Sequence, residues 1–379
     1  MTRSKVTGRM QSSLAELQST SQLRELGSFS GVDLCSNDYL GLASDGRLRT
    51  RVKQGLDGCE RVGATGSRLL SGHHELWDQL EEEFAEFAGT ESALFFSSGY
   101  AANTGLLSAI LEADDVVFSD QLNHASIVDG IRLSRSRKLI YPHADMDVLE
   151  DALRCHSDGT GGRVIVTESI FSMDGDRAPI AEIFRLASEY GAEVIVDEAH
   201  ATGVCGPCGR GLVAESGYEA LAVVHTCGKA LASVGAFVCG SKVLRRYLIN
   251  HARSFIFSTA LPPYFAIQIA TSLRLARLMD KERDHLAFSG EYLRNGLSCL
   301  GFQLKRGGSH IVPLVVGSNE SALHLAAALR QHGFVVRAIR PPSVPAGTAR
   351  LRLSLTANIQ IGDLDRFLAA LPGLQGAHA

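Results

Sequence analysis

A lysine near the middle of the chain stands where a nucleophilic amine could act. Lys229 ends the stretch Thr226-Cys227-Gly228-Lys229, which follows an apolar run at 221–225 and precedes another at 235–239. A lysine amine in weakly polar surroundings loses its proton more readily than one in water, and the neutral amine attacks carbonyl groups to form a Schiff base. A single lysine after a strand is weak evidence, so the polar residues upstream decide its interpretation.

The stretch Ser97-Ser98-Gly99-Tyr100-Ala101-Ala102-Asn103 follows one predicted strand and opens a predicted helix. Gly99 permits a tight turn, and the first N–H groups of a helix have no acceptor within the helix. Such a helix start can bind a phosphate group. An ordinary strand-to-helix turn is the alternative.

A second strand end carries acidic residues. The apolar run 194–196 leads into Asp197-Glu198-Ala199-His200. A carboxylate at the end of a buried strand needs a partner, and a protonated pyridine nitrogen would serve as one. A metal site and a helicase-like acidic box are alternatives. The helicase-like interpretation is disfavoured because no glycine-lysine-threonine phosphate loop precedes the motif.

Three further segments add polar groups to this set. His124, in the loop 120–126, could stack on a flat aromatic ligand, although such a histidine is more often a surface or capping residue. The polar stretch 167–176 follows another strand, where α/β sheets bind ligands, although its aspartates could simply form turns. The hydroxyls of the stretch 257–263 could reach a phosphate.

Two arginines alternate along a late strand. Arg350 and Arg352 share one face of the run 350–354, and a guanidinium there could bind a carboxylate through two hydrogen bonds. A solvated outer face is the alternative. A phosphate site, a buried aspartate, a lysine and a carboxylate-binding arginine together favour a pyridoxal-phosphate site.

Apolar runs that alternate with helical patterns must position these residues. The alternation predicts an α/β fold with a mainly parallel sheet covered on both faces. Seven strands are expected in the large domain, at 93–96, 116–119, 139–141, 164–167, 194–197, 221–225 and 235–239. Helices are expected around 76–87, 101–111, 148–153, 180–190 and 267–278.

The sequence predicts three parts: an N-terminal arm at 1–41, a large domain at 42–273 and a smaller C-terminal α/β domain at 274–379. In the small domain, strands are expected at 311–316, 335–339 and 351–355, with helices at 322–331 and 363–371.

Composition narrows the function classes. The 379 residues are 45% hydrophobic and 21% charged, with a formal net charge of -4, which makes nucleic acid an unlikely partner. A polar N-terminus without a hydrophobic signal stretch predicts a cytoplasmic protein. Eight scattered cysteines fit a reducing compartment. Cys205 and Cys208 have thioredoxin-like spacing, but no helix-forming run follows them to lower a thiol pKa.

These motifs resemble those of the α-oxoamine synthases, pyridoxal-phosphate enzymes of fold type I that join an amino acid to an acyl thioester and release carbon dioxide. The resemblance runs from about residue 36 to near the C-terminus. It rests on five motifs: G-Y-A-A-N at 99–103, N-H-A-S at 123–126, T-E-S-I-F-S-M-D-G-D at 167–176, D-E-A-H at 197–200 and T-C-G-K at 226–229.

The resemblance implies a role for each site residue. Lys229 carries pyridoxal 5'-phosphate covalently and later moves protons at the substrate α-carbon, and Asp197 pairs with the pyridine nitrogen. His124 stacks on the ring, while His200 and Ser172 contact the region of its phenolic oxygen. The residues implied to hold the phosphate are Gly99, Tyr100, Ala101 and Thr226, with Ser258 and Thr259 from the partner subunit of a homodimer. Asn37 and Arg352 are implied to bind the amino-acid carboxylate.

Within the family, residues 338–352 are most similar to the members that join L-alanine to a pimeloyl thioester, on coenzyme A or acyl carrier protein, for biotin synthesis. No metal is expected. Synthases that use glycine or serine remain open as alternatives. A pyridoxal-phosphate aminotransferase and a cofactor-binding regulatory domain are also open but less favoured.

Overall fold

The computed structural model describes residues 4–157, 159–304 and 308–375. They form two compact units. One, here called the sheet unit, comprises Asn37–Ser172 and Arg177–His285; the other, here called the terminal unit, comprises the chain up to Ser36, Met173–Asp176 and the chain from Leu286 onward.

The sheet unit contains seven strands in the order β2-β8-β7-β6-β5-β3-β4. All neighbouring pairs are parallel except those of β8, which runs antiparallel to β2 and β7. Each strand overlaps a run expected from the sequence, which confirms the mainly parallel seven-stranded sheet. The strands are β2 (Ser92–Phe96), β3 (Val116–Asp120), β4 (Arg137–Tyr141), β5 (Arg163–Glu168), β6 (Glu193–Asp197), β7 (Ala222–Thr226) and β8 (Ala236–Gly240).

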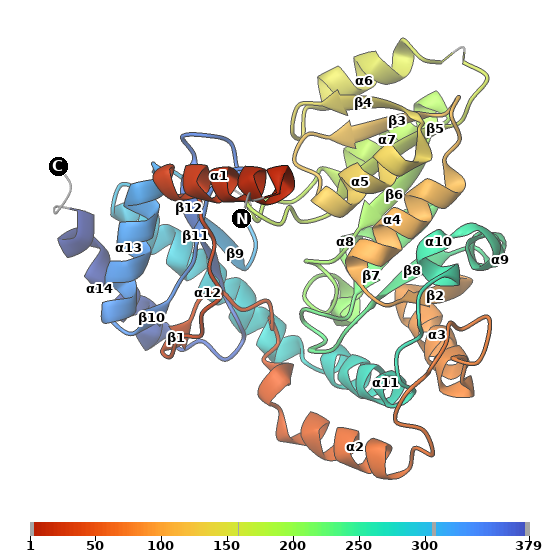
Figure 1. The fold of residues 1–379 in the computed structure, drawn as a ribbon, viewed down its shortest axis with the longest axis horizontal. Helices are drawn as coiled ribbons and strands as arrows, with labels where there is room; N and C mark the ends of the chain where they lie inside the picture. Colours follow the sequence, from red (N-terminus) through yellow and green to blue (C-terminus); the bar gives the residue numbers. More distant parts are fainter. Residues whose placement is uncertain (1–3, 158, 305–307, 376–379) are drawn as a thin grey trace. The chain divides into compact units, whose positions relative to one another are not determined.

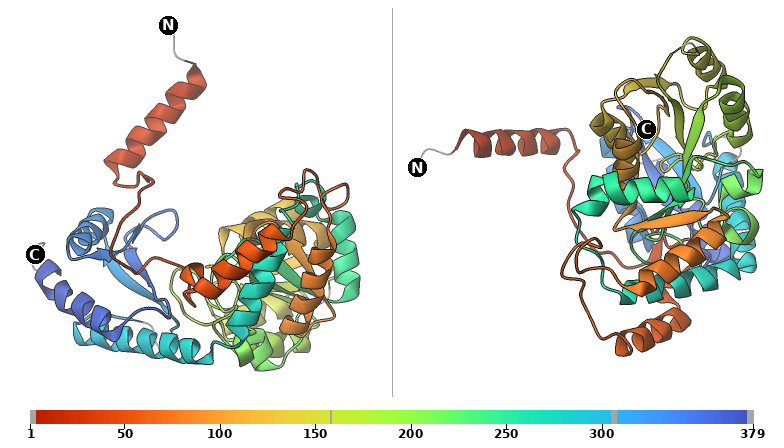
Figure 2. Two further views of the ribbon diagram at one scale, coloured as in Figure 1. Left: turned by 90° about the horizontal axis from the view of Figure 1, so that it is seen from below. Right: turned by 90° about the vertical axis from the view of Figure 1, so that its right-hand side faces the viewer.

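Helices cover both faces of this sheet (Figure 1; Figure 2). The helices of the sheet unit are α2 (Gly46–Asp57), α3 (Glu75–Ala88), α4 (Gly99–Ile110), α5 (Ala125–Ser134), α6 (Met146–Arg154), α7 (Ile180–Tyr190), α8 (Leu212–Ser216), α9 (Lys242–His251), α10 (Arg253–Ile256) and α11 (Tyr264–Arg277). The expected helices all appear. The expected ranges did not include α2, α5, α8, α9 and α10. In α5, Asp129 and Gly130 interrupt the apolar residues.

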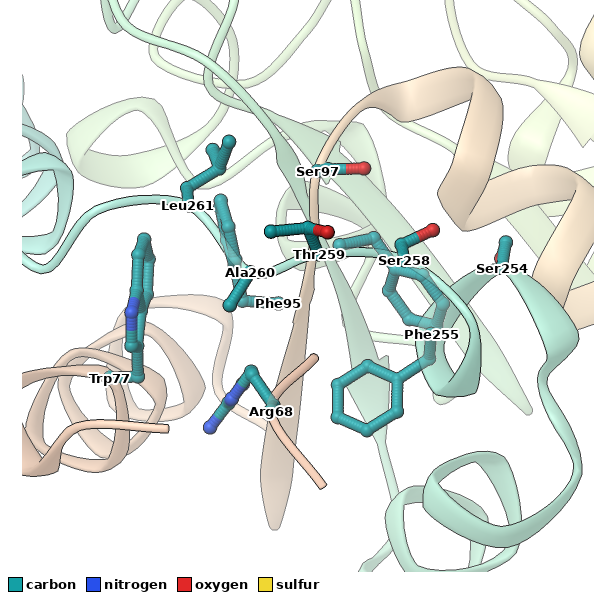
Figure 3. A pocket seen from close by; sticks show the side chains of 11 residues that line it. Arg68, Trp77, Phe95, Ser97, Ser254, Phe255, Ser258, Thr259, Ala260 and Leu261 are labelled. Carbon is teal, nitrogen blue, oxygen red and sulfur yellow. The ribbon is translucent and has the colours of Figure 1, made fainter. Parts of the chain in front are cut away.

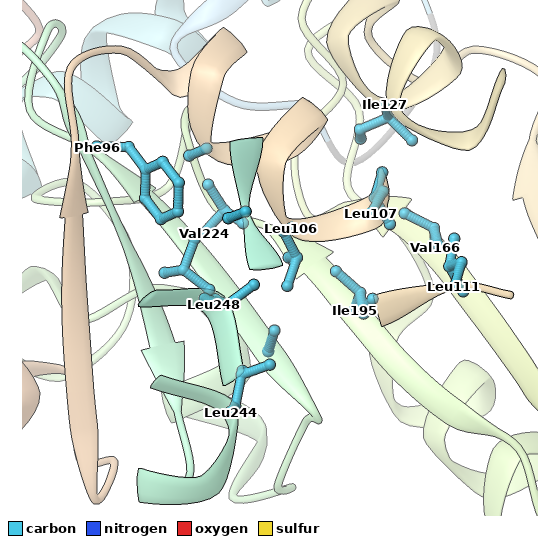
Figure 4. Packing of buried hydrophobic residues seen from close by; sticks show 14 of the residues in the cluster. Phe96, Leu106, Leu107, Leu111, Ile127, Val166, Ile195, Val224, Leu244 and Leu248 are labelled. Carbon is cyan, nitrogen blue, oxygen red and sulfur yellow. The ribbon is translucent and has the colours of Figure 1, made fainter. Parts of the chain in front are cut away.

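Strand alternation divides the core between the two faces. On β8, Ala236 and Val238 join a buried apolar cluster with Leu106 and Leu107 of α4 (Figure 4). Phe237 points to the other face, where its ring stacks on Phe84 of α3 with centroids 3.9 Å apart. Because both faces of β8 are buried, the strand reads as a continuous apolar run rather than an alternating one.

The terminal unit holds the remaining strands. β9 (Ile311–Gly317), β12 (Ala349–Ser354) and β11 (Ala338–Ile339) form an antiparallel sheet in the order β11-β12-β9. The single strand expected at 335–339 is divided between β10 (Phe334–Val335) and β11. The helices that lie wholly in this unit are α1 (Lys5–Ser19), α13 (Asn319–Gln331) and α14 (Ile361–Gln375).

The unit boundaries differ from the predicted divisions at 41 and 273. They fall at 36/37 and at 285/286, the latter inside α12 (Asp280–Cys299). The N-terminal residues group with the C-terminal part because β1 (Val32–Asp33) pairs in parallel with β10. Strand pairing across 300 residues leaves no local sequence signal, so composition alone could not place this boundary. No helix among the described residues is long and apolar enough to cross a membrane.

The loop between β7 and β8 depends on a glycine. Gly235 has φ +83°, and a Cβ atom there would overlap the Phe95 ring and lie 2.7 Å from the Phe96 carbonyl oxygen. We predict that Gly235→Ala lowers the free energy of unfolding by at least about 2 kcal/mol, because backbone strain and overpacking add. Chemical denaturation would measure it.

Gly217→Ala is the matched control. Gly217 has φ +73° with no atom within 4 Å of a Cβ, so only the backbone strain applies, about 1 kcal/mol. Equal stability of the two alanine variants would contradict the close packing described around Gly235.

Candidate active site

Lys229 lies at one end of a chain of side-chain contacts. Its Nζ is 3.0 Å from Nε2 of His200, and Nδ1 of His200 is 2.6 Å from the hydroxyl of Tyr39. The Tyr39 hydroxyl in turn donates to Oδ1 of Asn37 at 3.0 Å. His200 and Tyr39 are buried, and Lys229 is half-buried. The structure thus brings three predicted site residues together through Tyr39, which the prediction did not include.

The hydrogen-bond directions assign the histidine tautomer. A tyrosine hydroxyl that donates to Asn37 can only accept from His200, so Nδ1 of His200 carries the proton. Nε2 of His200 is then an acceptor for an N–H of Lys229. The His200 ring is held by Tyr39, so the lone pair on its Nε2 has a fixed direction. This lone pair accepts from the Lys229 amine and thereby determines where the lysine nitrogen lies.

Asp197 is the last residue of β6 and is buried. Its Oδ2 accepts from Nδ2 of Asn103 at 2.7 Å, and its Oδ1 accepts from the Ala199 N–H at 2.8 Å. Asn103 also donates to Oγ of Ser126 at 2.9 Å. A buried carboxylate without such donors would be costly, and these two hydrogen bonds compensate for its burial.

His124 caps the N-terminus of α5. Its Nδ1 lies 2.7 Å from Oγ of Ser126 and accepts from the Ser126 N–H at 3.2 Å, so the ring is held from one edge. The side chain is nevertheless exposed, as a ring that stacks on a ligand must be. Desolvation by the surrounding protein lowers the pKa of His124, an effect that Asp197 opposes and Lys229 reinforces. The ring is therefore neutral at neutral pH.

The predicted phosphate residues lie close together. A Cβ atom on Gly99, the first residue of α4, would lie 3.7 Å from Oγ1 of Thr226, at the end of β7. The N–H of Ala101 is already donated to Oγ of Ser98 at 3.0 Å. The phosphate role of Ala101 stays a prediction. The N–H groups of Gly99 and Tyr100 precede the first intrahelical bond and remain as candidates.

The remaining predicted residues occupy other places. Ser258 and Thr259 line a pocket together with Ser97, which follows β2 (Figure 3). Their role at the phosphate of a partner subunit stays a prediction. Ser172 is buried in the sheet unit, after β5.

Arg352 belongs to the terminal unit, where it lies on β12 in register with Pro313 of β9. Both Arg350 and Arg352 are buried, so the alternative of a solvated outer face is wrong. Arg350 forms an ion pair with Asp174 inside the terminal unit, which accounts for its burial. The role of Arg352 as a carboxylate clamp stays a prediction.

Sequence reasoning missed Tyr39, Asn103 and Ser126 as site residues. Asn103 and Ser126 close the motifs G-Y-A-A-N and N-H-A-S, and Tyr39 lies two residues after Asn37. Their type and position alone gave no signal, since Asn and Ser near helix starts usually act as caps. Only the contact between α4 and β6 reveals that Asn103 reaches Asp197.

The cysteine pair does not form a reactive thiol site. Cys205 is buried, which raises its pKa to about 12, whereas Cys208 is exposed. All eight cysteines are free thiols. Among the described residues, no group of three or more His, Cys, Asp or Glu side chains is placed to hold a metal ion.

Comparison with known proteins identifies the family. The model of the class I and II aminotransferases matches residues 30–371. An 8-amino-7-oxononanoate synthase of Marinobacter nauticus is 44% identical over 90% of this chain and 86% of the relative. The enzyme of that name from Geobacter sulfurreducens is 46% identical over 90% and 88%.

Solved structures agree on the fold. A serine palmitoyltransferase of Sphingomonas wittichii has a TM-score of 0.89 at 29% identity and covers 99% of this chain, with 98% of its own chain matched. An 8-amino-7-oxononanoate synthase of Francisella tularensis has a TM-score of 0.78 at 30% identity and covers 92% and 98%. The chain therefore belongs to the class I and II aminotransferase family, with the fold of type I pyridoxal-phosphate enzymes, and within it to the α-oxoamine synthases.

Proposed function

We propose that this protein joins L-alanine to a pimeloyl thioester, on coenzyme A or acyl carrier protein, with loss of carbon dioxide to form 8-amino-7-oxononanoate. The observation that carries the proposal is the Lys229 amine held 3.0 Å from His200 in the same unit as a buried Asp197. The substrate choice is supported by relatives of that name at 44% and 46% identity over 90% of the chain.

The residues present fit pyridoxal 5'-phosphate. Asp197 offers a buried carboxylate for a protonated ring nitrogen, His124 offers an exposed flat ring, and Lys229 offers the amine for the aldehyde. The start of α4, beside Thr226, offers N–H donors for the phosphate. When bound, the cofactor supplies an electron sink that stabilises negative charge at the amino-acid α-carbon.

The chain's own residues then have distinct tasks. Asn103 and the Ala199 N–H orient the Asp197 carboxylate, which would pair with a protonated ring nitrogen facing it. His200 holds the Lys229 amine in place, and this amine takes the α-proton and later returns one. The α-carbon of the amino acid then attacks the thioester carbonyl, and the thiol leaves. The resulting β-keto acid loses carbon dioxide readily.

We further propose a homodimer with shared sites, in which Ser258 and Thr259 complete the phosphate site of the partner subunit. Asn37 and Arg352 would bind the carboxylate of alanine, since a guanidinium pairs with a carboxylate through two hydrogen bonds. The support for these roles is the resemblance of the motifs and the burial of Arg352 on β12.

A serine palmitoyltransferase activity is the second candidate, because such an enzyme superposes with the higher TM-score of 0.89. The identity to it is 29%, however, against 44% to the synthase of Marinobacter nauticus. Fold similarity at this level says little of the substrate, since function depends on side chains grafted onto a shared fold. The sequence comparison therefore favours alanine and a pimeloyl thioester.

Lys229→Ala should abolish turnover and covalent retention of the cofactor, because no amine remains for the aldehyde. Reduction with borohydride followed by mass spectrometry of the intact protein measures the attachment. Lys242→Ala, at the exposed start of α9, is the matched control and should retain the label. Label on the Lys229→Ala variant would exclude Lys229 as the attachment residue.

Asp197→Asn should lower kcat by at least roughly hundredfold while the cofactor stays bound, because a neutral amide no longer keeps the ring nitrogen protonated. Steady-state kinetics, with cofactor content determined from absorbance, would measure both quantities. An Asp197→Asn enzyme with unchanged kcat would contradict the pairing of Asp197 with the ring.

Turnover of alanine, glycine and serine with pimeloyl, acetyl and palmitoyl thioesters tests the substrate proposal. We expect alanine with the pimeloyl donor to give the highest kcat/KM and carbon dioxide release in step with thiol release. A preference for serine with the palmitoyl donor would favour the second candidate. Formation of the amine form of the cofactor with a keto acid and no thioester would indicate an aminotransferase.

A further inference from the structure

A second carboxyl group lies beside Asp197 and has no part in the reaction described above. Glu168 is the last residue of β5, and the parallel register of β5 and β6 places it directly opposite Asp197. Glu168 is only 2% exposed and Asp197 6%. Two carboxyl groups thus meet at neighbouring strand ends with little water.

The surroundings of Glu168 leave one oxygen uncommitted. The backbone N–H groups of His124 and Ser172 face its carboxyl group. Oε1 is buried and has no hydrogen-bond partner among the residues that the structure describes. An orphaned polar atom at such a place indicates a functional constraint, since buried polar atoms are otherwise paired.

The strand end itself is fixed by Asn123. Its Oδ1 accepts from the Glu168 N–H at 3.2 Å, and its Nδ2 donates to the Val166 carbonyl oxygen at 2.7 Å and to Oγ of Ser119 at 2.9 Å. Asn123 immediately precedes His124. Glu168 is therefore tied through backbone and side chain to the loop that carries the predicted stacking residue.

The charges around Glu168 favour its protonated form. Burial and the negative charge of Asp197 raise its pKa to about 8, whereas Lys229 and the two facing N–H groups act in the opposite direction. Among the other titratable groups at this edge, His124 is neutral because its own pKa is lowered, Asp120 at the end of β3 is paired with His143, and burial raises the pKa of Glu198 to about 7. At neutral pH Glu168 is therefore mostly an uncharged acid.

We propose that Glu168 is a positioning residue that acts as an uncharged acid, holding the backbone of His124 and Ser172 at the cofactor ring and leaving Asp197 as the only anion of this pair of carboxyl groups. The inference rests on the proposed use of pyridoxal phosphate. A second negative charge would compete with Asp197 for the same cationic groups and would weaken the fixed geometry around the ring.

The test is the pH dependence of cofactor affinity, measured with the full chain. Pyridoxal 5'-phosphate is titrated into cofactor-free protein between pH 6.5 and 9.5 and followed by its absorbance. If binding needs a group protonated with a pKa near 8, affinity at pH 9 should be about tenfold weaker than at pH 7 in the wild type. Glu168→Gln should bind within about twofold of wild type at pH 7 and should lose most of this alkaline weakening.

Glu198→Gln is the matched control. Glu198 is also a buried glutamate next to Asp197, but its two oxygens accept from the N–H groups of Leu212 at 3.0 Å and Val213 at 2.9 Å. An amide cannot accept both bonds, so this variant should lose stability and keep the alkaline weakening. An alkaline weakening that persists in Glu168→Gln, or a more than tenfold loss of its affinity at pH 7, would overturn the inference.

The stability of the cofactor-free protein gives a second readout that needs no activity. A carboxyl whose folded pKa is raised from 4.5 to about 8 keeps its proton in the folded state while the unfolded state releases it. Its contribution to stability therefore falls as pH rises through this window. Glu168→Gln should flatten that fall in urea unfolding curves, and an unchanged slope would also count against the inference.

The outcomes separate this inference from the proposed function. A wild-type protein that binds no pyridoxal phosphate would contradict the proposed function. A wild-type protein that binds the cofactor, together with a Glu168→Gln variant that titrates as the wild type does, would contradict only the role of Glu168.

Discussion

The site depends on ionisable side chains that are buried at the carboxyl ends of parallel strands. Asp197 ends β6 and Glu168 ends β5, and the register sets them side by side. A bare carboxylate could not remain there, so the fold supplies Asn103 from α4 and the Ala199 N–H. The chemistry of the site therefore depends on how α4 packs against the sheet.

Because of this constraint, different strand and helix ends of the sheet unit supply the different groups of the site. The end of β6 provides the anion, the loop after β7 provides the amine, and the start of α4 provides N–H donors. His200, three residues after Asp197, reaches Nζ of Lys229 at 3.0 Å and so links the β6 and β7 strand ends. After the loop that carries Lys229, the chain runs back along β7 as the antiparallel strand β8. Gly235 allows this loop to pack closely against Phe95 and Phe96.

The two arginines of β12 illustrate why neighbouring residues of one type need separate interpretations. Arg350 is paired with Asp174, which lies in the short segment Met173–Asp176 that groups with the terminal unit. That ion pair accounts for the burial of Arg350. The sequence placed both arginines on one strand face but did not reveal that Arg350 pairs with Asp174.

The sequence by itself determined the elements and the residue types of the site. Seven runs predicted the seven strands, because six of these strands are buried on both faces and are therefore largely apolar, whereas β4 at the sheet edge is mostly exposed. The motifs around Gly99, His124, Asp197 and Lys229 indicated the chemistry, since each follows a strand. Local patterns therefore sufficed wherever one segment carried the whole signal.

Only the tertiary structure determined which side chains and strands contact one another. The contacts of Tyr39 with His200, of Asn103 with Asp197 and of β1 with β10 join residues 161, 94 and about 300 positions apart. No periodicity within a segment records such a contact, because it arises when separate elements pack. The same holds for the raised pKa of Glu168, which follows from burial beside Asp197 and not from its neighbours in the chain.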